Sequence, residues 1–542
     1  MTAVTALRPA AGAPAGRSHP VVLYWLPLAV VLAVQTMLSA RLIPLSIATG
    51  DESLYIYSGH QLIYEMWHGG GSPYYETFFS GSPYLYPVMA AVIDHVGGLA
   101  AVRLASLFFM LVSTTLLYGT ARVIFDYWPA VIAAALFVGL GITQALGALA
   151  TYDALALMLT AAASYCAARA ADNGRHVTRW LALVLLLLLA ANAVKYASAL
   201  FDPVVLGLGA LLIAYQGWKH VAQRFAVLSA ALTLLLVLAV YLEGSAYLNG
   251  ISFTTLARKT GTQVVINDHY TPTRDIILSS WDWAGAILSF GVLALLMSVL
   301  VFRERRNAMV LAVLLSASVL VLVEYVHLHA LTAFSNHADF AVWFTCVGAG
   351  YALVRPAELA HRWYVRFPLA AIAAAVTIAV GLHYTDSGVG GSRQDSPLYV
   401  LLRPYLALKS GQYLLGGELD TQMIYTEHIN MAWYQYVDDN YIKYPIPGRG
   451  GDAHGQANGP TCMQLRPDCM YLEGIAGYRA AIRAGWFTII SMVGAHGTLQ
   501  DAEIEQAVER TPGYVLLTDI GGAPTWIYTP AYRVRSLGTS GR

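Results

Sequence analysis

Acidic residues stand at two points where an apolar run ends or begins. Asp51 and Glu52 follow the first long apolar run, and Asp153 opens a later one. A carboxylate in such a place can accept the proton of a substrate hydroxyl. Two adjacent carboxylates at an apolar boundary resist double ionisation, which favours a role for one of them as a general base. The alternative is that these residues start a solvated loop or cap a helix N-terminus, as Asp often does.

Two basic residues are expected at the same level as the acids. Arg103 begins one apolar run and Lys195 ends another. Together they could clamp a phosphate group, because charge-assisted hydrogen bonds to phosphate are strong. Either side chain could instead extend to lipid headgroups, the usual fate of a basic residue near the end of a membrane helix.

A further polar cluster surrounds the ninth and tenth runs. Glu324, His327 and His337 could line a cavity or form a hydrogen-bond network inside a helix bundle. His60, Glu65 and His68 have part of a metal-ligand pattern without a fourth ligand, so no metal site is predicted; a divalent metal is possible but not indicated. The chain has no Walker or dinucleotide glycine pattern in a strand-to-helix setting, which argues against a nucleotide-driven pump and a nucleotide-sugar enzyme.

Composition indicates a membrane protein. Of the 542 residues, 57% are apolar or aromatic and 12% are charged, whereas a soluble domain carries about 25% charged residues. The formal net charge is zero, so no basic surface field exists to attract nucleic acid. Soluble enzymes and nucleic-acid-binding proteins are thereby disfavoured.

Eleven apolar runs with few charged residues have about the length needed to cross a bilayer. We therefore predict about eleven transmembrane helices, near residues 22–44, 99–119, 129–148, 153–171, 180–197, 203–217, 225–243, 283–301, 307–326, 337–354 and 367–384. The stretch 83–97 is interrupted by Pro87, Asp94 and His95, which indicates an interfacial or re-entrant piece. Counting it as a twelfth span is the alternative.

The basic residues indicate the orientation. With the N-terminus inside, the cytoplasmic segments hold fourteen Arg and Lys residues and the short outer segments hold six, as the positive-inside rule requires. The domains are then a cytoplasmic tail (1–21), a transmembrane module (22–384) with outer loops at about 45–98 and 244–282, and an extracytoplasmic region (385–542). The preference for Arg over Lys, with many Ala, Leu, Val and Gly residues, is typical of a GC-rich bacterial genome. With the spans, it leads us to predict a multi-pass protein of a bacterial plasma membrane.

The region after residue 384 alternates strand and helix patterns, which predicts a small α/β domain. Strands are expected at 423–426, 486–492 and 514–518, and helices at 478–484 and 502–510. Cys462 and Cys469 are candidates for a local disulfide in an oxidising compartment, with two unpaired thiols as the alternative.

Several of these elements together resemble the polytopic GT-C glycosyltransferases. They are Asp51-Glu52 after the first span, the Gly/Pro/aromatic loop Phe79–Pro87, Arg103 opening the next span, and the Tyr152–Ala156 element. The nearest resemblance is to glycosyltransferase family 39, which includes protein O-mannosyltransferases and lipid A aminoarabinose transferases. The stretch Lys195–Pro203 resembles that family's Lys element before a Pro.

The resemblance implies an inverting transfer of a sugar from a polyprenyl-phosphate donor to an acceptor hydroxyl at the outer face of the membrane. The acceptor would be a glycan, a lipid or a protein. Asp51 would be the general base, Glu52 would support it, and Asp153 would be the second acid. Arg103 and Lys195 would stabilise the departing phosphate.

The sequence departs from the family in its first outer loop. Many relatives carry a Lys-Pro-Pro element there, and this chain has Ser82-Pro83-Tyr84. Phosphate binding would then fall on Arg103, Lys195, Arg258 or Lys259. The non-enzymatic alternative is a transporter or flippase of a lipid-linked sugar. A transporter usually shows repeated halves with broken helices, and the sequence shows no repeat.

Overall fold

The computed structural model describes most of the helical module and parts of the C-terminal region. The described residues are 21–44, 48–68, 79–171, 176–243, 248, 251, 271–329, 331, 334–359, 363–388, 401–402, 405, 413–416, 436–438, 442–445, 471–492, 499–520 and 523–530. Arg258, Lys259, Cys462, Cys469 and the strand expected at 423–426 lie outside them.

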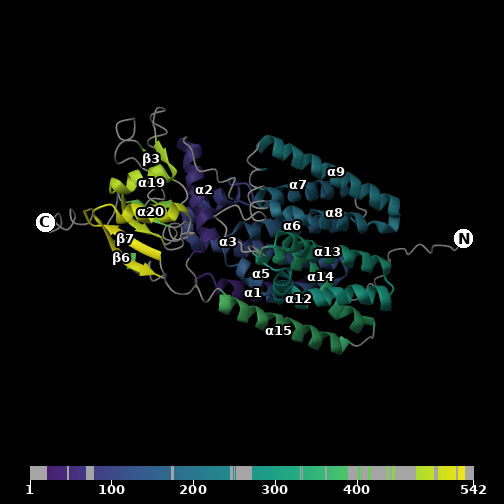
Figure 1. Ribbon diagram of the computed structural model, residues 1–542. Helices are drawn as coiled ribbons and strands as arrows, with labels where there is room; N and C mark the ends of the chain where they lie inside the picture. The colour runs from purple at the N-terminus through teal and green to yellow at the C-terminus, as the bar shows by residue number, and fades with distance from the viewer. Residues whose placement is uncertain are drawn as a thin grey trace.

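The helical module is a bundle with one hydrophobic core that runs through most of its helices (Figure 1). Its first half contains α1 (Val21–Ala40), α2 (Gly50–His68), α3 (Tyr86–Ile124), α4 (Tyr127–Gly139), α5 (Gly141–Leu146), α6 (Tyr152–Arg169) and α7 (Val177–Val194). Its second half contains η2 (Tyr196–Phe201), α8 (Asp202–Leu211), η3 (Ala214–Gln216), α9 (Trp218–Glu243), α12 (Thr273–Leu296), η5 (Met297–Val301), α13 (Arg305–Leu328), α14 (Phe334–Leu359) and α15 (Trp363–Gly388).

Each of the eleven predicted runs coincides with helical structure. Within the described residues, six helices are long and apolar enough to cross a membrane: Tyr86–Ile124, Val177–Val194, Trp218–Leu242, Thr273–Val301, Arg305–Leu328 and Pro368–Asp386. Shorter apolar helices cover Trp25–Ala40, Tyr127–Gly139 and Tyr196–Leu211. The chain is therefore an α-helical polytopic membrane protein.

The outer loop predicted at 45–98 is largely helical. The helix α2 occupies residues 50–68, and the interrupted stretch 83–97 forms the first part of α3. A kink at Gly98 (φ 68°, ψ −173°) separates this part from the rest of α3. The positive φ is a conformation that glycine adopts at little cost. The kink allows the chain to lie against α2 before it enters the bundle.

The C-terminal region forms a small α/β domain. Its five-stranded sheet has the order β2-β1-β5-β7-β6. The strand β1 is parallel to its neighbours β2 and β5. The strand β7 is antiparallel to its neighbours β5 and β6. The elements are β1 (Tyr413–Gly416), β2 (Tyr436–Asp438), β5 (Phe487–Ser491), β6 (Tyr514–Ile520), β7 (Ala523–Tyr528), α19 (Gly474–Arg483) and α20 (Leu499–Glu509). A separate antiparallel pair joins β3 (Lys443–Pro445) and β4 (Tyr471–Glu473).

Tyr478, Phe487, Ile490 and Ile504 belong to the separate core of this domain. The predicted strands at 486–492 and 514–518 and the two predicted helices are confirmed. The sheet domain lies at the same end of the molecule as α2 (Figure 1).

Candidate active site

The acidic pair at the start of α2 divides into one buried and one exposed carboxylate. The side chain of Glu52 is fully buried, whereas Asp51 is exposed. Glu52 accepts hydrogen bonds from the backbone N–H of Thr49 (2.8 Å) and of Ala150 (2.7 Å). The bond to Thr49 caps the helix N-terminus, and the bond to Ala150 joins α2 to the residue just before α6.

Arg103 completes the environment of Glu52. Its Nε and Nη2 donate to the two carboxylate oxygens at 2.7 and 2.8 Å, and its Nη1 donates to the carbonyl of Ile43 at 2.7 Å. The Arg103 side chain is 2% exposed. Such a bidentate pair fixes both partners. Arg103 therefore holds the start of α2 against α3, and this fixes the position from which Asp51 extends.

Lys195 and Asp153 form a second buried ion pair. Lys195 Nζ donates to Asp153 Oδ1, and Asn336 of α14 donates to Asp153 Oδ2 at 3.2 Å. The two charged side chains are 3% and 2% exposed. Lys195 Nζ also lies 5.3 Å from the centre of the Tyr152 ring and 5.9 Å from that of Phe340, within the range of cation–π attraction. Neither Lys195 nor Arg103 extends along the surface of the bundle to lipid headgroups.

Lys195 occupies an extended break between α7 and η2. The loop before α3 is bound along this break: Ser82 N donates to Ala193 O at 2.7 Å, and Tyr196 N donates to Ser80 O at 2.8 Å. A Cβ atom on Gly81 would lie 1.9 Å from Val194 O, so only glycine permits this approach. The Gly/Pro/aromatic loop thus holds the backbone of Lys195 in place.

Four aromatic rings fill the space between the two ion pairs. Tyr55 contacts Phe79, Tyr86 and Tyr152, with ring centres 5.4, 5.8 and 4.6 Å apart. Tyr55 belongs to α2, which is outside the spans. Burial raises the pKa of Tyr55 well above its ordinary value, and charges on Tyr152, Asp51 and Asp153 raise it further. Its hydroxyl consequently stays protonated, and it forms a hydrogen bond with the Tyr152 side chain.

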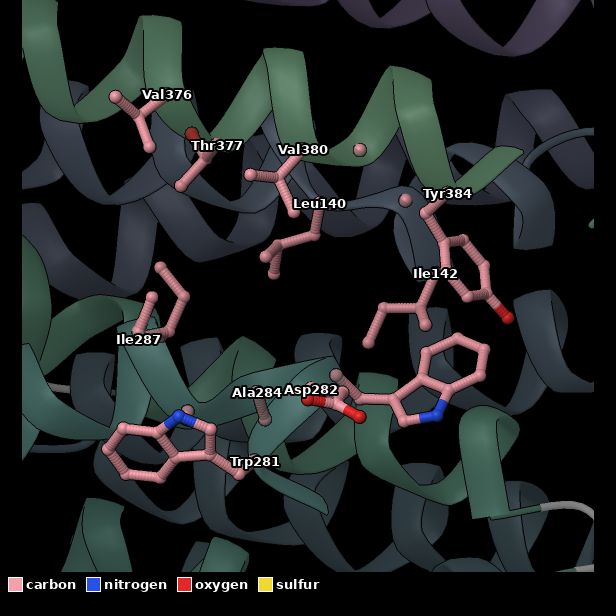
Figure 2. Close-up of a pocket in the computed structure, with 15 residues that line it drawn as sticks. Leu140, Ile142, Trp281, Asp282, Ala284, Ile287, Val376, Thr377, Val380 and Tyr384 are labelled. Carbon is pink, nitrogen blue, oxygen red and sulfur yellow. The ribbon is translucent and has the colours of Figure 1, made fainter. Parts of the chain in front are cut away.

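His337, one of the residues expected to line a cavity, lies near the second ion pair. His337 Nδ1 is 3.1 Å from the Tyr325 hydroxyl and 3.6 Å from Glu324 Oε2, and His337 is one residue from Asn336, which contacts Asp153. His327 lies in the last turn of α13. Glu324, His327 and His337 do not line the cavity between α12 and α15, whose lining includes Trp281, Thr377 and Tyr384 (Figure 2).

The described residues contain no group of three His, Cys, Asp or Glu side chains that could hold a metal. His60 instead contacts Asp94 Oδ2 at 2.9 Å, which ties α2 to the first part of α3.

Sequence reasoning did not predict that Glu52 and Arg103 would pair, or that Asn336 would contact Asp153. For the Glu52–Arg103 pair, the available signal was an acidic and a basic residue, each at the boundary of an apolar run. Asn336 lies 183 positions after Asp153, and the sequence held no signal for their contact.

The comparisons with known proteins concern part of the sequence and the fold. Residues 81–242 match the family model described as dolichyl-phosphate-mannose-protein mannosyltransferase. No curated protein matches the chain. The structure of ArnT from Cupriavidus metallidurans bound to undecaprenyl phosphate superposes with a TM-score of 0.59 at 13% identity, covering 93% of this chain and 97% of that one. ArnT in the apo state gives a TM-score of 0.57 at 13% identity, covering 94% and 98%.

The predicted resemblance to the GT-C glycosyltransferases is thus confirmed. The chain has an ArnT-like fold with a small C-terminal sheet domain, and the match of residues 81–242 to a mannosyltransferase family model supports the expected enzyme class.

Proposed function

We propose that this glycosyltransferase moves a single sugar from a polyprenyl-phosphate donor to an acceptor hydroxyl at the outer face of a bacterial plasma membrane. The observation that supports it best is the arrangement of Asp51 and Lys195. An exposed carboxylate and a buried cation occur at one end of the bundle, on elements tied to each other through Ala150, Tyr152 and Tyr55.

Asp51 is the proposed general base. Its carboxylate accepts the proton of the acceptor hydroxyl, while the hydroxyl oxygen attacks the anomeric carbon of the donor. The bond between that carbon and the phosphate oxygen breaks, and both electrons of the bond leave with the polyprenyl phosphate. A single displacement of this kind inverts the anomeric configuration. Glu52 supports Asp51 by fixing the first turn of α2 through Arg103.

Lys195 is the proposed principal phosphate ligand. An ammonium group has three N–H donors, and the described residues supply one acceptor for them, Asp153. Arg103 remains a predicted ligand, but three of its nitrogens already bond within the protein. Asp153 and Asn336 would orient Lys195 between turnovers. Arg258 and Lys259 stay predicted contributors from the second outer loop.

The orientation of the chain is part of the proposal. The sheet domain and α2 share one end of the molecule (Figure 1), Glu52 of α2 belongs to the first ion pair, and the positive-inside bias supports an outer location for that end. The acceptor therefore approaches from the extracytoplasmic side. The ArnT structure with the similar fold contains undecaprenyl phosphate, which supports a lipid-linked donor for this chain.

Sugar transfer from a panel of radiolabelled polyprenyl-phosphate sugars to membrane extracts tests the proposal. The purified wild type should form a new glycosidic bond in detergent, and Asp51→Asn should reduce the rate about 100-fold to 10,000-fold. Asp275→Asn, the same change at another exposed aspartate near the outer helix ends, should leave the rate unaltered. Full activity in Asp51→Asn would move the base to Glu52 or Asp153.

The same assay separates the proposal from its alternatives. A flippase needs sealed vesicles and leaves the donor chemically unchanged, so donor movement without bond formation would favour transport. Transfer of a whole lipid-linked oligosaccharide would show as a larger product from an oligosaccharide donor.

A further inference from the structure

The helical path of the chain is interrupted at Lys195, although the local sequence favours a continuous helix. The helix α7 ends at Val194, and Lys195 has the extended backbone angles φ −150° and ψ 106°. Sharp helix breaks usually occur at Pro or Gly. Residues 189–202 contain neither, and their Ala, Leu and Lys residues are good helix formers. Contacts beyond the local backbone must therefore hold Lys195 in its extended conformation.

The side chain of Asn192 bridges this break. Asn192 lies in the last turn of α7, where its Nδ2 donates to Asp202 Oδ2 at 2.8 Å and its Oδ1 accepts from Ser198 Oγ at 2.7 Å. Ser198 belongs to η2, and Asp202 is the first residue of α8. Asn, Ser and Asp side chains compete with the hydrogen bonds of a helical backbone. The three side chains thus give the chain an alternative to a continuous helix.

The three residues form this network inside the bundle. Asn192 and Ser198 are each 1% exposed and Asp202 is 7% exposed. Burying a carboxyl group is costly unless the group is hydrogen-bonded. The second oxygen of Asp202, Oδ1, is buried and has no hydrogen-bond partner in the part of the chain that the structure describes. Within that part, the contact with Asn192 is therefore the only hydrogen bond of the Asp202 carboxyl group.

The network encloses the backbone of Lys195. Lys195 N donates to Ala191 O at 2.8 Å, and Lys195 O accepts from Ser198 N at 2.9 Å. The loop before α3 binds the same break through Ser80 and Ser82. If the break became helical, the Cα–Cβ bond of Lys195 would change direction, and its ammonium group would move away from Asp153. The network and the loop together therefore fix where the ammonium group lies.

We propose that Asn192, Ser198 and Asp202 are positioning residues for Lys195. They hold the break between α7 and α8 in the conformation that directs Lys195 Nζ toward Asp153 and, during the reaction, toward the donor phosphate. The second part of this statement rests on the proposed function of Lys195. Misplacing a group that acts on the substrate by about 1 Å can reduce the rate about a hundredfold.

Binding of undecaprenyl phosphate to the full chain in detergent, followed by tryptophan fluorescence, tests the network. Asp202→Leu removes the acceptor for Asn192 and should weaken binding about tenfold or more. Asp202→Asn keeps an acceptor oxygen and should recover most of this loss. In the transfer assay, Asp202→Leu should raise the donor KM and leave the acceptor KM unaltered. Equal binding by Asp202→Leu and the wild type would overturn the inference.

A smaller change keeps the test valid if Asp202→Leu does not fold. Ser198→Ala removes one hydroxyl and should weaken binding of undecaprenyl phosphate about twofold to tenfold. Thr345→Val is the matched control, because it removes a hydroxyl that contacts Ser318 at 2.8 Å elsewhere in the bundle, and it should bind like the wild type. In the Lys195→Met background, Ser198→Ala should cause no further loss, since both changes act through the same ammonium group. Additive losses would contradict the proposed positioning role.

Hydrogen–deuterium exchange separates the inference from the proposed function. The amides of Lys195, Tyr196 and Ser198 are hydrogen-bonded, and they should exchange faster in Ser198→Ala than in the wild type or Thr345→Val. If Lys195→Met binds undecaprenyl phosphate normally while Ser198→Ala accelerates this exchange, the phosphate role of Lys195 is refuted and the positioning role is supported. If Lys195→Met loses binding while Ser198→Ala changes neither binding nor exchange, the positioning role is refuted and the proposed function stands.

Discussion

The carboxylate of Glu52 and the guanidinium of Arg103 face each other in two parallel contacts of 2.7 and 2.8 Å, across 51 positions of sequence. Both groups are almost completely buried. Because the backbone N–H groups of Thr49 and Ala150 also bind this carboxylate, the Glu52 side chain connects the start of α2 to α3 and to the residues before α6, and Arg103 adds a bond to Ile43 after α1. The Glu52–Arg103 pair therefore fixes the start of α2, next to the proposed base Asp51.

Removing one partner of the Glu52–Arg103 pair should destabilise the protein. Arg103→Met leaves the Glu52 carboxylate buried without its cation, which typically costs about 3–5 kcal/mol. Thermal unfolding in detergent should show a marked decrease in Tm for Arg103→Met and a partial recovery when Glu52→Gln is added. Arg479→Met removes a cation from the half-exposed pair with Glu503 and should have a small effect. A normal Tm for Arg103→Met would contradict the assignment.

Lys195→Met should weaken the interaction with the phosphate. The expected result is a loss of about tenfold to hundredfold in kcat/KM for the donor, since one charge-assisted hydrogen bond contributes about 1.5–3 kcal/mol. Binding of polyprenyl phosphate, measured by tryptophan fluorescence, should weaken in parallel. Asp51→Asn serves as the comparison: it should lose turnover and keep phosphate binding. Unchanged phosphate binding in Lys195→Met would transfer the role to Arg103, Arg258 or Lys259.

Gly81→Ala should disturb the position of Lys195 without touching a charged group. The new Cβ would lie 1.9 Å from Val194 O, so the loop and the break after α7 must separate, at a typical overpacking cost of about 1–3 kcal/mol. Sugar transfer and Tm should both decrease. Gly207→Ala is the matched control, because its Cβ would meet Val313 at an ordinary 3.5 Å. Equal behaviour of the two variants would show that the loop does not position Lys195.

Low pH should weaken the interactions of Glu304 with Tyr351, Arg355 and Asn307; Glu304 lies in the turn before α13. Burial alone would raise the pKa of Glu304, but hydrogen bonds from Tyr351, Arg355 and Asn307 outweigh it, so that the net pKa is lowered. A lowered carboxyl pKa contributes stability that is present above the unfolded-state pKa, near 4.3, and is lost as the pH falls through the folded-state value.

Thermal unfolding measured between pH 7 and pH 3.5 checks this. The wild type should lose part of its Tm advantage over Glu304→Gln as the pH decreases, so that the two curves approach each other at the acid end. Curves that stay parallel over the whole range would show that Glu304 contributes nothing through its charge.

Hydrophobicity was sufficient to predict the helices of the module, because a span of about twenty apolar residues has few alternatives in a bilayer. Hydrophobicity was insufficient to predict α2. Its sequence, Gly50–His68, mixes charged residues with apolar ones such as the buried Tyr55 and Ile56, so a loop was predicted there. Long-range partners such as Asn336 for Asp153 depend on how helices are arranged in space. A single sequence holds no record of that arrangement.

The pairing of Lys195 with Asp153 also bears on how a turnover would end. A polyprenyl phosphate carries about 1.5–2 negative charges near pH 7, as phosphate monoesters do, whereas the sugar-bearing diester carries one. The leaving lipid would therefore be attracted to Lys195 more strongly than the incoming donor. The Asp153 carboxylate competes with the polyprenyl phosphate for the Lys195 ammonium group. When Asp153 pairs with Lys195 again, the polyprenyl phosphate is displaced and the charges of the two side chains balance. On the proposed function, the buried ion pair promotes product release.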